Sequence, residues 1–234
     1  MIDNRYFHVP LENPIVVDIV SDVMCPWCYI GKRRFERALE ELGDLPLFVR
    51  WRPFQLDATL PKEGKDRAQY LSDKFGGDAQ AAEIYSRIAA AGEEEGIPFA
   101  FERIEVSPNT IDAHRVIRWA AVEHCQDDVV EQLFQAYFLD GRNIGDHETL
   151  VDIADSAGLR GEIVRELLPT DSERESVEQE IASAQEIGVT GVPTFIIDER
   201  YAVVGAQSTE TILKAIHQAV EDRANAPAEG HGEN

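Results

Sequence analysis

The sequence predicts an α/β fold whose small sheet is divided by a large helical insertion. Three observations support this fold class: a strand, helix, strand pattern before residue 58, helical periodicity from about residue 61 to 188, and strand character that returns after Gly188. The two strand-bearing segments are expected to pair into one sheet of at least four strands. We therefore expect a discontinuous sheet domain from residues 13–58 and 186–222, with residues 59–185 as the inserted helical domain.

The first strand-bearing segment has clear boundaries. Residues 15–20 form an apolar run in which β-branched residues dominate, which is typical of a buried strand. Residues 28–41 have helical spacing and end near Gly43. Residues 45–51 alternate in polarity as a second strand, which Pro53 is expected to end.

Helical spacing then dominates the chain. The predicted helices cover residues 65–75, 78–95, 111–125, 127–139, 147–157, 160–167 and 171–187. Asp146 is a candidate N-cap for one of them and Thr170 for another. The segment 99–106 fits either extended or irregular structure.

The second strand-bearing segment follows Gly188. Residues 193–198 and 201–204 are expected to form two strands joined by a tight hairpin. Ser208 is a candidate cap for a last helix that reaches about Arg223. The Ala-, Gly-, Pro- and acid-rich end of the chain, residues 223–234, is predicted to be a disordered tail.

Charge is the strongest compositional feature. Acidic residues outnumber basic ones 44 to 22, which gives a formal net charge of −22. The acids are spread along the chain, a composition that resembles proteins of salt-accumulating halophiles, although an ordinary acidic mesophilic protein is the alternative. No basic patch is available to neutralise phosphates, so nucleic-acid binding is not expected.

Hydropathy argues against a membrane location. The sequence contains no run of about 18 or more apolar residues, so no transmembrane helix is expected. The segment Met1–Tyr6 lacks a basic stretch followed by an apolar region, and we therefore expect a cytoplasmic protein.

The tetrapeptide Cys25-Pro26-Trp27-Cys28 is the leading candidate for chemistry. It lies between the first strand and the first helix, and a helix N-terminus stabilises a thiolate through its free N–H groups and its dipole. Cys25 is expected to be the exposed attacking thiolate and Cys28 the more buried resolving thiol. Pro26 suits the first helical turn, and Trp27 is a candidate apolar rim for a polypeptide substrate.

A zinc half-site is the structural rival for this pair. The chain has three cysteines, so Cys125 is the remaining thiol, and no histidine lies within ten residues of the pair. Tetrahedral coordination needs more ligands, which favours redox chemistry and no resident metal.

Val192-Pro193 is a second candidate element, because a proline that enters a strand cannot donate to the ladder. A cis bond there would free backbone groups for pairing with an extended substrate. An ordinary trans bond entering an edge strand is the alternative, and the residues alone favour it because most X-Pro bonds are trans.

Together these segments resemble a known family. Residues 21–32 (Ser-Asp-Val-Met-Cys-Pro-Trp-Cys-Tyr-Ile-Gly-Lys), 191–195 (Gly-Val-Pro-Thr-Phe) and 205–207 (Gly-Ala-Gln), with 109–115, 133–138 and 141–145 between them, resemble the DsbA-like thioredoxin superfamily, in particular FrnE-type dithiol–disulfide isomerases. The resemblance covers roughly residues 13–220. It implies a thioredoxin fold with an inserted helical domain and a cis-proline at Pro193 facing Cys25.

The resemblance also implies a function and its alternatives. It implies a protein thiol–disulfide oxidoreductase or isomerase with polypeptide substrates, no resident cofactor, and a thioredoxin- or glutathione-like recycling system. Related glutathione-dependent isomerases and kappa-class transferases have serine where this chain has Cys25, so they are the enzymatic alternative. A redox-switched holdase chaperone is the non-enzymatic alternative.

The remaining polar candidates have weaker patterns. Asn109 and His114 fall in a family segment that approaches the redox site, where they would contact substrate or simply hold the helical domain. Asp18 or Asp22 is a candidate proton acceptor, although a capping or exposed role suits Asp22 better. Cys125 is expected to pack inside as a small apolar residue. The basic run of residues 32–34 would add charge near the thiolate or form a solvated helix face.

Overall fold

A four-stranded mixed sheet forms the centre of the molecule. The computed structural model describes residues 13–225, and its sheet has the strand order β2-β1-β5-β6. The bounds are Ile15–Ser21 for β1, Leu47–Pro53 for β2, Thr194–Ile197 for β5 and Tyr201–Val204 for β6. The two halves of the sheet therefore pair across a long insertion, and the predicted α/β fold class is confirmed.

The register places the redox tetrapeptide at one end of the sheet. β1 runs parallel to β2 and antiparallel to β5, with Ser21 opposite Pro53 and Val20 opposite Thr194. The carboxyl end of β1 thus meets the start of β5. The chain leaves β1 at this edge and enters the first helix at Pro26, so residues that are 167 positions apart in sequence are brought together.

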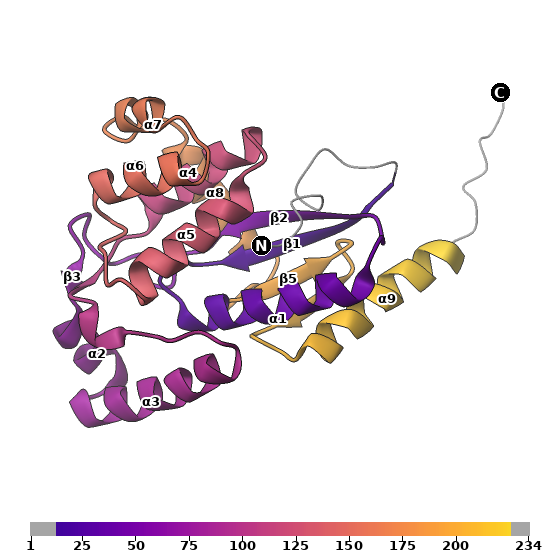
Figure 1. Ribbon diagram of the computed structural model, residues 1–234, viewed down its shortest axis with the longest axis horizontal. Coiled ribbons are helices and arrows are strands. Elements are labelled where there is room, and N and C mark those ends of the chain that lie inside the picture. The colour runs from indigo at the N-terminus through magenta and orange to yellow at the C-terminus, as the bar shows by residue number, and fades with distance from the viewer. Residues whose placement is uncertain (1–12, 226–234) are drawn as a thin grey trace.

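Two helices cover one face of the sheet. α1 (Pro26–Leu42) and α9 (Thr209–Asn225) lie side by side beneath the strands, as Figure 1 shows in indigo and yellow. Phe35 of α1 stacks on Phe195 of β5 with a centroid separation of 5.5 Å, and Ile212 and Ile216 of α9 are fully buried. Burial of these apolar side chains stabilises the layer.

The insertion is helical almost throughout and gathers at the end of the sheet where β1 and β2 finish (Figure 1). Its elements are β3 (Lys65–Asp66), α2 (Arg67–Phe75), α3 (Asp78–Glu94), β4 (Val106–Ser107), α4 (Ile111–Val122), α5 (Gln126–Phe138), α6 (His147–Ser156), α7 (Gly161–Leu167) and α8 (Arg174–Glu186). Each predicted helix has a counterpart here, and its ends differ from the predicted ones by at most three residues.

Three predictions concern helix caps, and one concerns the segment 99–106. The carboxylate of Asp146 accepts a hydrogen bond from the Thr149 amide, and the Ser208 hydroxyl accepts one from Thr211, so both predicted caps are confirmed. The predicted Thr170 cap is wrong, because α8 begins only at Arg174 and the Thr170 hydroxyl donates to the Leu167 carbonyl instead. The ambiguous segment 99–106 contains a short 3-10 turn at residues 101–103 and the start of β4.

The end of α9 also corrects an expected boundary. The helix continues to Asn225, past the tail start expected at residue 223, because Arg223 is held in place. Its guanidinium pairs with Asp198 and donates to the backbone carbonyls of Asn13 and Pro14. The rest of the expected tail, and the N-terminal segment used to argue for a cytoplasmic location, lie outside the described residues.

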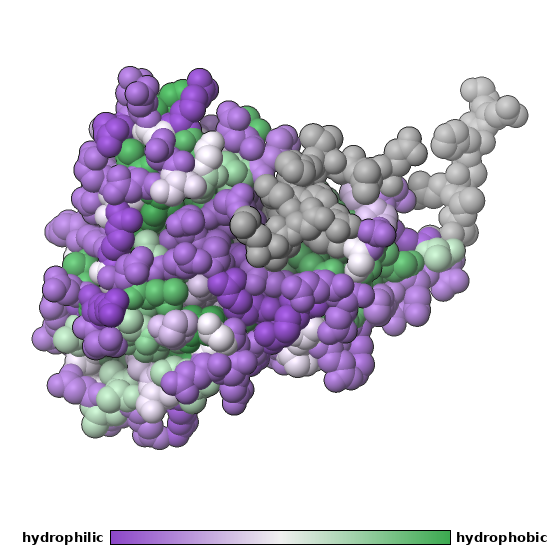
Figure 2. Space-filling model, viewed as in Figure 1, coloured by the Kyte–Doolittle hydropathy of each residue, from purple (hydrophilic) through white to green (hydrophobic). Residues whose placement is uncertain are grey.

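The visible face of the molecule is mostly hydrophilic, with apolar side chains scattered among the polar ones (Figure 2). Within residues 13–225, no helix is both long enough and apolar enough to cross a bilayer. The excess of carboxylates over basic groups in the sequence gives this surface its strong negative charge.

Candidate active site

Cys25 and Cys28 lie at the start of α1, as the sequence predicts. Cys25 is the residue immediately before the helix, in an extended conformation, and Pro26 is the first helical residue. The Cys25 amide donates to the Asp22 carbonyl over 2.9 Å, and the Cys28 amide donates to the Cys25 carbonyl over 3.0 Å. Both side chains are free thiols, so the pair is in its dithiol state.

The expected exposure of Cys25 is wrong. Its residue surface is only 4% exposed, against 1% for Cys28. Cys25 packs into the main apolar core cluster, whereas Trp27 between the two thiols is 39% exposed. The physical reason is that the loop carrying Val192 lies directly against the Cys25 sulfur, which a sequence pattern for an exposed helix terminus does not reveal.

The Val192-Pro193 peptide bond is cis, which confirms the expectation that came from the family resemblance. The Cys25 thiol points to the Val192 carbonyl oxygen at 3.7 Å, and Pro193 is buried beside it. The start of β5 therefore supplies one wall of the site. A backbone carbonyl this close to the sulfur is positioned where an extended substrate chain would hydrogen-bond.

The absence of a side chain at Gly31 allows Pro193 to approach α1 closely. A Cβ atom at Gly31 would lie 2.7 Å from Pro193 Cγ, a contact that real Cβ atoms essentially never show. The helix surface must therefore be bare at this position. Gly31 belongs to the family-like segment in the sequence, but its packing role becomes visible only when β5 is placed against α1.

The two thiols differ in their electrostatic setting. Burial raises the pKa of the Cys28 thiol well above its ordinary value, and the neighbouring Cys25 sulfur adds to this shift. Cys28 therefore stays protonated near neutral pH until a disulfide-exchange step removes its proton. A thiol that keeps its proton is compatible with a resolving role for Cys28.

Asp22 lies behind the pair and is fully buried. One carboxylate oxygen accepts from the Leu56 amide at 2.8 Å, and the other accepts from the Met24 amide at 3.4 Å. The expected capping role and the expected exposure are both wrong, because Cys25 is the residue before α1 and the Asp22 carboxylate binds loop amides instead. Asp22 ties the Cys25 loop to the segment that follows β2.

His114 and Asn109 hold this same segment from the helical side. The His114 ring nitrogen Nε2 lies 2.8 Å from the Phe54 carbonyl and 3.6 Å from the Asp22 carboxylate. The Asn109 side-chain amide donates to the Leu60 carbonyl, and its oxygen accepts from the Gln55 side chain. Their polar atoms are engaged by the backbone and side chains of residues 54–60.

The expectation of a solvated or thiolate-facing basic run at residues 32–34 is wrong. Lys32 has a side chain that is 2% exposed, and its ammonium group pairs with Glu36, Asp127 and Glu131. Arg34 donates to Glu95 and to the Ala206 carbonyl. The run therefore connects α1 to α5, α3 and the α9 side of the molecule.

Two other candidate residues, Asp18 and Cys125, have structural roles. Arg50 donates to the Asp18 carboxylate from Nε at 2.7 Å and from Nη2 at 2.6 Å, so Asp18 is not directed at the thiols. Cys125 is 8% exposed, and burial raises its pKa, which confirms that it packs as a small buried residue.

An aromatic cluster in the insertion carries a residue that the sequence analysis missed. Arg67, the first residue of α2, is buried, and its guanidinium carbon lies 5.0 Å from the Tyr85 ring, 5.7 Å from the Tyr137 ring and 6.0 Å from the Phe101 ring. No motif or spacing marks this arginine. The only available sign is its position at a helix start among aromatic residues that are distant in sequence.

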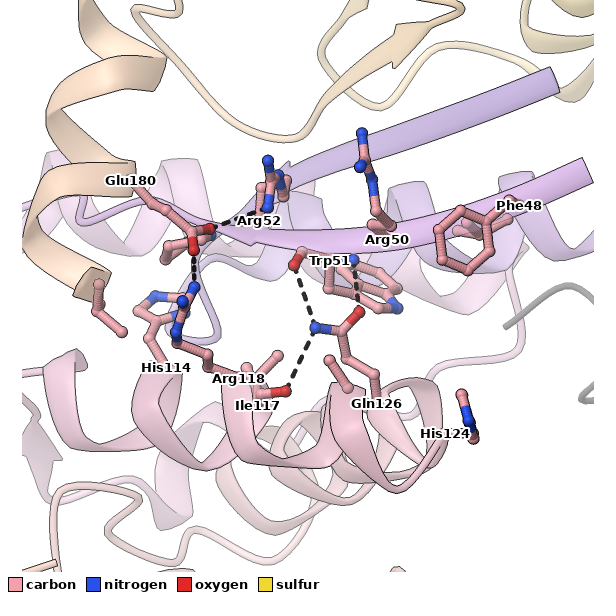
Figure 3. Close-up of a pocket in the computed structure, with 14 residues that line it drawn as sticks. Phe48, Arg50, Trp51, Arg52, His114, Ile117, Arg118, His124, Gln126 and Glu180 are labelled. Carbon is pink, nitrogen blue, oxygen red and sulfur yellow. Dashed lines mark hydrogen bonds and ion pairs between the residues drawn. The ribbon is translucent and has the colours of Figure 1, made fainter. Parts of the chain in front are cut away.

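A cavity of about 230 Å³ lies away from the thiols, between β2, α4 and α8 (Figure 3). Glu180 lies between Arg52 and Arg118 and pairs with both. The Gln126 amide oxygen accepts from the Trp51 amide at 2.8 Å, and its nitrogen donates to the Trp51 carbonyl at 3.3 Å. Gln126 thus caps the free edge of β2, and the lining groups satisfy one another.

The thiols have no metal-binding partners in the part of the chain that the structure describes. No group of three or more His, Cys, Asp or Glu side chains there is arranged to hold a metal ion. The site therefore consists of two thiols, the Val192 carbonyl, the buried proline and the loop that Asp22 holds.

Comparison with known proteins places this geometry in a family. A model of the DsbA-like thioredoxin domain matches residues 16–217. The chain belongs to the DsbA-like thioredoxin family. A solved structure of a probable DsbA oxidoreductase from Streptomyces coelicolor agrees with this assignment: it is 31% identical, its TM-score is 0.82, and the match covers 94% of this chain and 97% of that chain.

Other relatives of this DsbA-like protein differ in their described roles. The uncharacterised protein YwbO of Bacillus subtilis is 28% identical over 201 residues, which are 86% of this chain and 94% of the relative. A cytosolic disulfide reductase DsbM from Pseudomonas aeruginosa, solved with GSH, is 18% identical with a TM-score of 0.61 over 90% of this chain and all of that chain. At that identity the likeness shows the shared fold.

Proposed function

We propose that this DsbA-like oxidoreductase exchanges disulfides of polypeptides through Cys25 and Cys28, as a FrnE-type dithiol–disulfide oxidoreductase or isomerase. The observation that supports it most is the placement of the Cys25 sulfur 3.7 Å from the Val192 carbonyl, beside a cis-proline. A thiolate beside a backbone carbonyl that an extended chain can pair with suits attack on a disulfide in such a chain.

The exchange has two balanced steps. The Cys25 thiolate attacks one sulfur of a substrate disulfide, the substrate S–S bond breaks, and the released sulfur leaves as a thiolate that takes up a proton. Cys28 then loses its proton and attacks the Cys25 sulfur, which releases the second substrate thiol and forms the Cys25–Cys28 disulfide. The substrate gains two electrons, and isomerisation results when a substrate thiol replaces Cys28 in the second step.

The remaining residues receive supporting roles. Trp27, exposed between the thiols, and Val192 with Pro193 and Pro26 form the proposed substrate contacts. His114 and Asn109 are proposed to position the loop under Cys25 rather than to touch substrate. We treat residues 59–185 as a separate inserted domain that covers one side of this site.

We further propose a cytoplasmic location, a thioredoxin- or glutathione-like recycling partner and a halophilic source. The chain has three cysteines, so one of them, Cys125, stands outside the Cys25–Cys28 pair, and such sparse cysteine usage suits a reducing compartment. The net charge of −22 suits a protein that stays soluble at high salt.

Reduction of insulin disulfides tests the proposed chemistry. Cys25→Ser should abolish turnover, and Cys28→Ser should accumulate mixed disulfides that mass spectrometry detects, because the resolving thiol is missing. Cys125→Ser is the matched control and should keep the wild-type rate. Full activity in both Cys25→Ser and Cys28→Ser would refute the proposal.

The same variants separate the alternatives. A glutathione-dependent transferase or isomerase would retain its activity without Cys28. A holdase would suppress aggregation of an unfolded client equally well without either thiol.

A further inference from the structure

Arg34 joins three segments of the chain around the redox helix. It follows Gly31 by three positions on α1, so the two residues lie on the same face of the helix. Its Nε donates to the Glu95 carboxylate at 2.6 Å, and its Nη1 donates to the Ala206 carbonyl at 2.5 Å. One guanidinium therefore connects the redox helix to the end of α3 and to the loop between β6 and α9.

A second hydrogen bond ties the same loop to Arg34. The hydroxyl of Thr209, the first residue of α9, donates to the Arg34 backbone carbonyl at 3.1 Å. The two contacts join residues that are 172 and 175 positions apart in the sequence. The loop is thus fastened to a single residue of α1 at Ala206 and at Thr209, and Arg34 sets its distance from the helix.

The loop that Arg34 holds is bonded in turn to the cis-proline. The amide of Gly205, one residue before the Arg34 contact, donates to the Pro193 carbonyl at 2.7 Å. The cis bond joins Pro193 to Val192, whose carbonyl oxygen lies 3.7 Å from the Cys25 sulfur. A continuous series of contacts therefore leads from the guanidinium through the loop to the wall of the thiol site.

Packing against α1 does not by itself orient this wall. Pro193 meets the helix at Gly31, where there is no side chain to grip the ring. Such a contact limits how closely the proline approaches but leaves its direction free, whereas hydrogen bonds are directional. The bonds from Arg34 to the loop supply the orientation that the contact at Gly31 lacks.

Glu95 holds the guanidinium in place. Its side chain is 6% exposed and pairs with both Arg34 and Arg37. Burial works to raise the pKa of Glu95, but the two arginines outweigh it and lower the pKa. The carboxylate therefore stays charged and fixes one edge of the planar Arg34 fork, which leaves another nitrogen of the fork to reach Ala206.

We propose that Arg34 is a positioning residue for the disulfide exchange, which orients the cis-proline wall so that the Val192 carbonyl can pair with an extended polypeptide. The inference rests on the proposed exchange at Cys25 and deepens it. The guanidinium is bonded to Glu95 and to the loop, so it acts through the loop and exchanges no proton or electron with the substrate.

This role has a consequence for substrate preference. An extended polypeptide can pair with a backbone carbonyl while it presents its disulfide to Cys25. A small neutral disulfide such as bis(2-hydroxyethyl) disulfide has no peptide backbone to lie along the Val192 carbonyl. A displaced wall should therefore weaken exchange with the polypeptide and spare exchange with the small molecule.

The ratio of two rate constants tests the proposal. The reduced protein is mixed with insulin or with bis(2-hydroxyethyl) disulfide at a series of concentrations, and oxidation of Cys25 and Cys28 is followed by mass shift. We expect Arg34→Met to lower the ratio of the insulin to the small-disulfide rate constant about tenfold, which corresponds to 1.4 kcal/mol. The loss should appear mainly as a higher insulin concentration at half-maximal rate.

Arg37 offers a matched control on the same helix. Its side chain is 45% exposed and pairs with the same Glu95 carboxylate. Arg37→Gln removes a partner of Glu95 and leaves the bond from Arg34 to Ala206 in place, so its ratio should equal that of the wild type. Arg34→Lys should recover part of the ratio, because it restores a charged donor without the fork.

Thr209→Val tests the same loop without altering the guanidinium. It removes the hydroxyl that donates to the Arg34 carbonyl. Because a neutral hydrogen bond is about half as strong as a charge-assisted one, we expect the ratio to fall about threefold. A merely structural role would change both rate constants by the same factor in Arg34→Met and in Thr209→Val. An unaltered ratio in both variants would overturn the inference.

The outcomes also separate this inference from the proposed function. If the wild-type thiols react with neither disulfide, the proposed exchange fails. If they react with both and the ratio does not depend on Arg34 or Thr209, only the positioning role fails. If Arg37→Gln lowers the ratio as much as Arg34→Met does, the pairing with Glu95 is responsible and the assignment through Ala206 is overturned.

Discussion

Lys32 and Arg67 are both buried cations near the redox helix, but their surroundings differ completely. The Lys32 ammonium has three carboxylate partners, of which Asp127 and Glu131 come from α5. Arg67 has aromatic rings, one hydroxyl acceptor and a nitrogen without a partner. The Lys32 cluster fixes the insertion to α1, whereas Arg67 is held inside the insertion by aromatic rings and a hydroxyl group.

The electrostatics of the Lys32 cluster support this interpretation. Burial works to lower the pKa of Lys32, but the charges of Asp127, Glu36 and Glu131 outweigh it and raise the pKa. Burial likewise opposes the ionised form of Glu131, yet Lys32 and Arg33 lower its pKa to about 2. Lys32 and Glu131 therefore hold each other in their charged forms, whereas burial raises the pKa of the neighbouring Asp127.

Removal of the satisfied cation should produce the largest effect. Lys32→Met leaves the three carboxylates without their shared partner, and removing one member of a buried pair typically costs about 3–5 kcal/mol. Urea unfolding followed by circular dichroism measures the change. Arg67→Met is the comparison variant and should cost less, about 2 kcal/mol, the scale of one desolvated cation–π contact. Equal losses in both variants would remove the distinction between the two clusters.

Gly31→Ala tests the opposite wall of the thiol site. The added Cβ would meet Pro193 Cγ at 2.7 Å, and overpacking of this kind costs about 1–3 kcal/mol. Displacement of the proline should also slow the reduction of insulin disulfides, because Pro193 forms one wall of the thiol site. Gly191→Ala is the matched control, because its Cβ would meet nothing within 4 Å. An unchanged rate in Gly31→Ala would show that the position of Pro193 against α1 does not matter for exchange.

Acid titration should give the smallest and most specific effect. The folded pKa of Glu131 lies below its ordinary 4.5, so its contribution to stability is complete above about pH 4.5 and is lost as the pH falls toward about 2. Glu131→Gln should flatten the decline of the unfolding free energy in that window, measured by urea unfolding at a series of pH values. Glu83→Gln, at an exposed position on α3, should leave the decline unchanged. An unaltered slope in Glu131→Gln would argue that the carboxylate is not held charged by Lys32.

Most of the element order could be predicted from sequence, because hydrophobic periodicity and turn residues are local properties. The run of residues 15–20 and the helical spacing of the insertion needed no tertiary information. Helix ends were less certain, as Thr170 shows, because a cap depends on where the backbone first becomes helical and not on residue type alone.

The sequence patterns predict wrongly how deeply some side chains are buried and which groups they pair with. Lys32 follows Gly31 on a helix that is predicted from spacing, and nothing nearby in sequence reveals that carboxylates 95 and 99 residues later surround it. The exposure of Cys25 was misjudged for the same reason, since the Val192 loop that covers it lies 167 residues away.

The sequence by itself determined the fold class, the thiol pair and the strand-to-helix junction that carries it, because each depends on neighbours within a few positions. The tertiary structure decided which wall the Cys25 sulfur faces, which cations are neutralised and that Arg67 is left with an unused donor. Those properties arise from contacts between segments separated by tens of residues or more, where charge and hydrogen bonding are settled by packing and not by spacing.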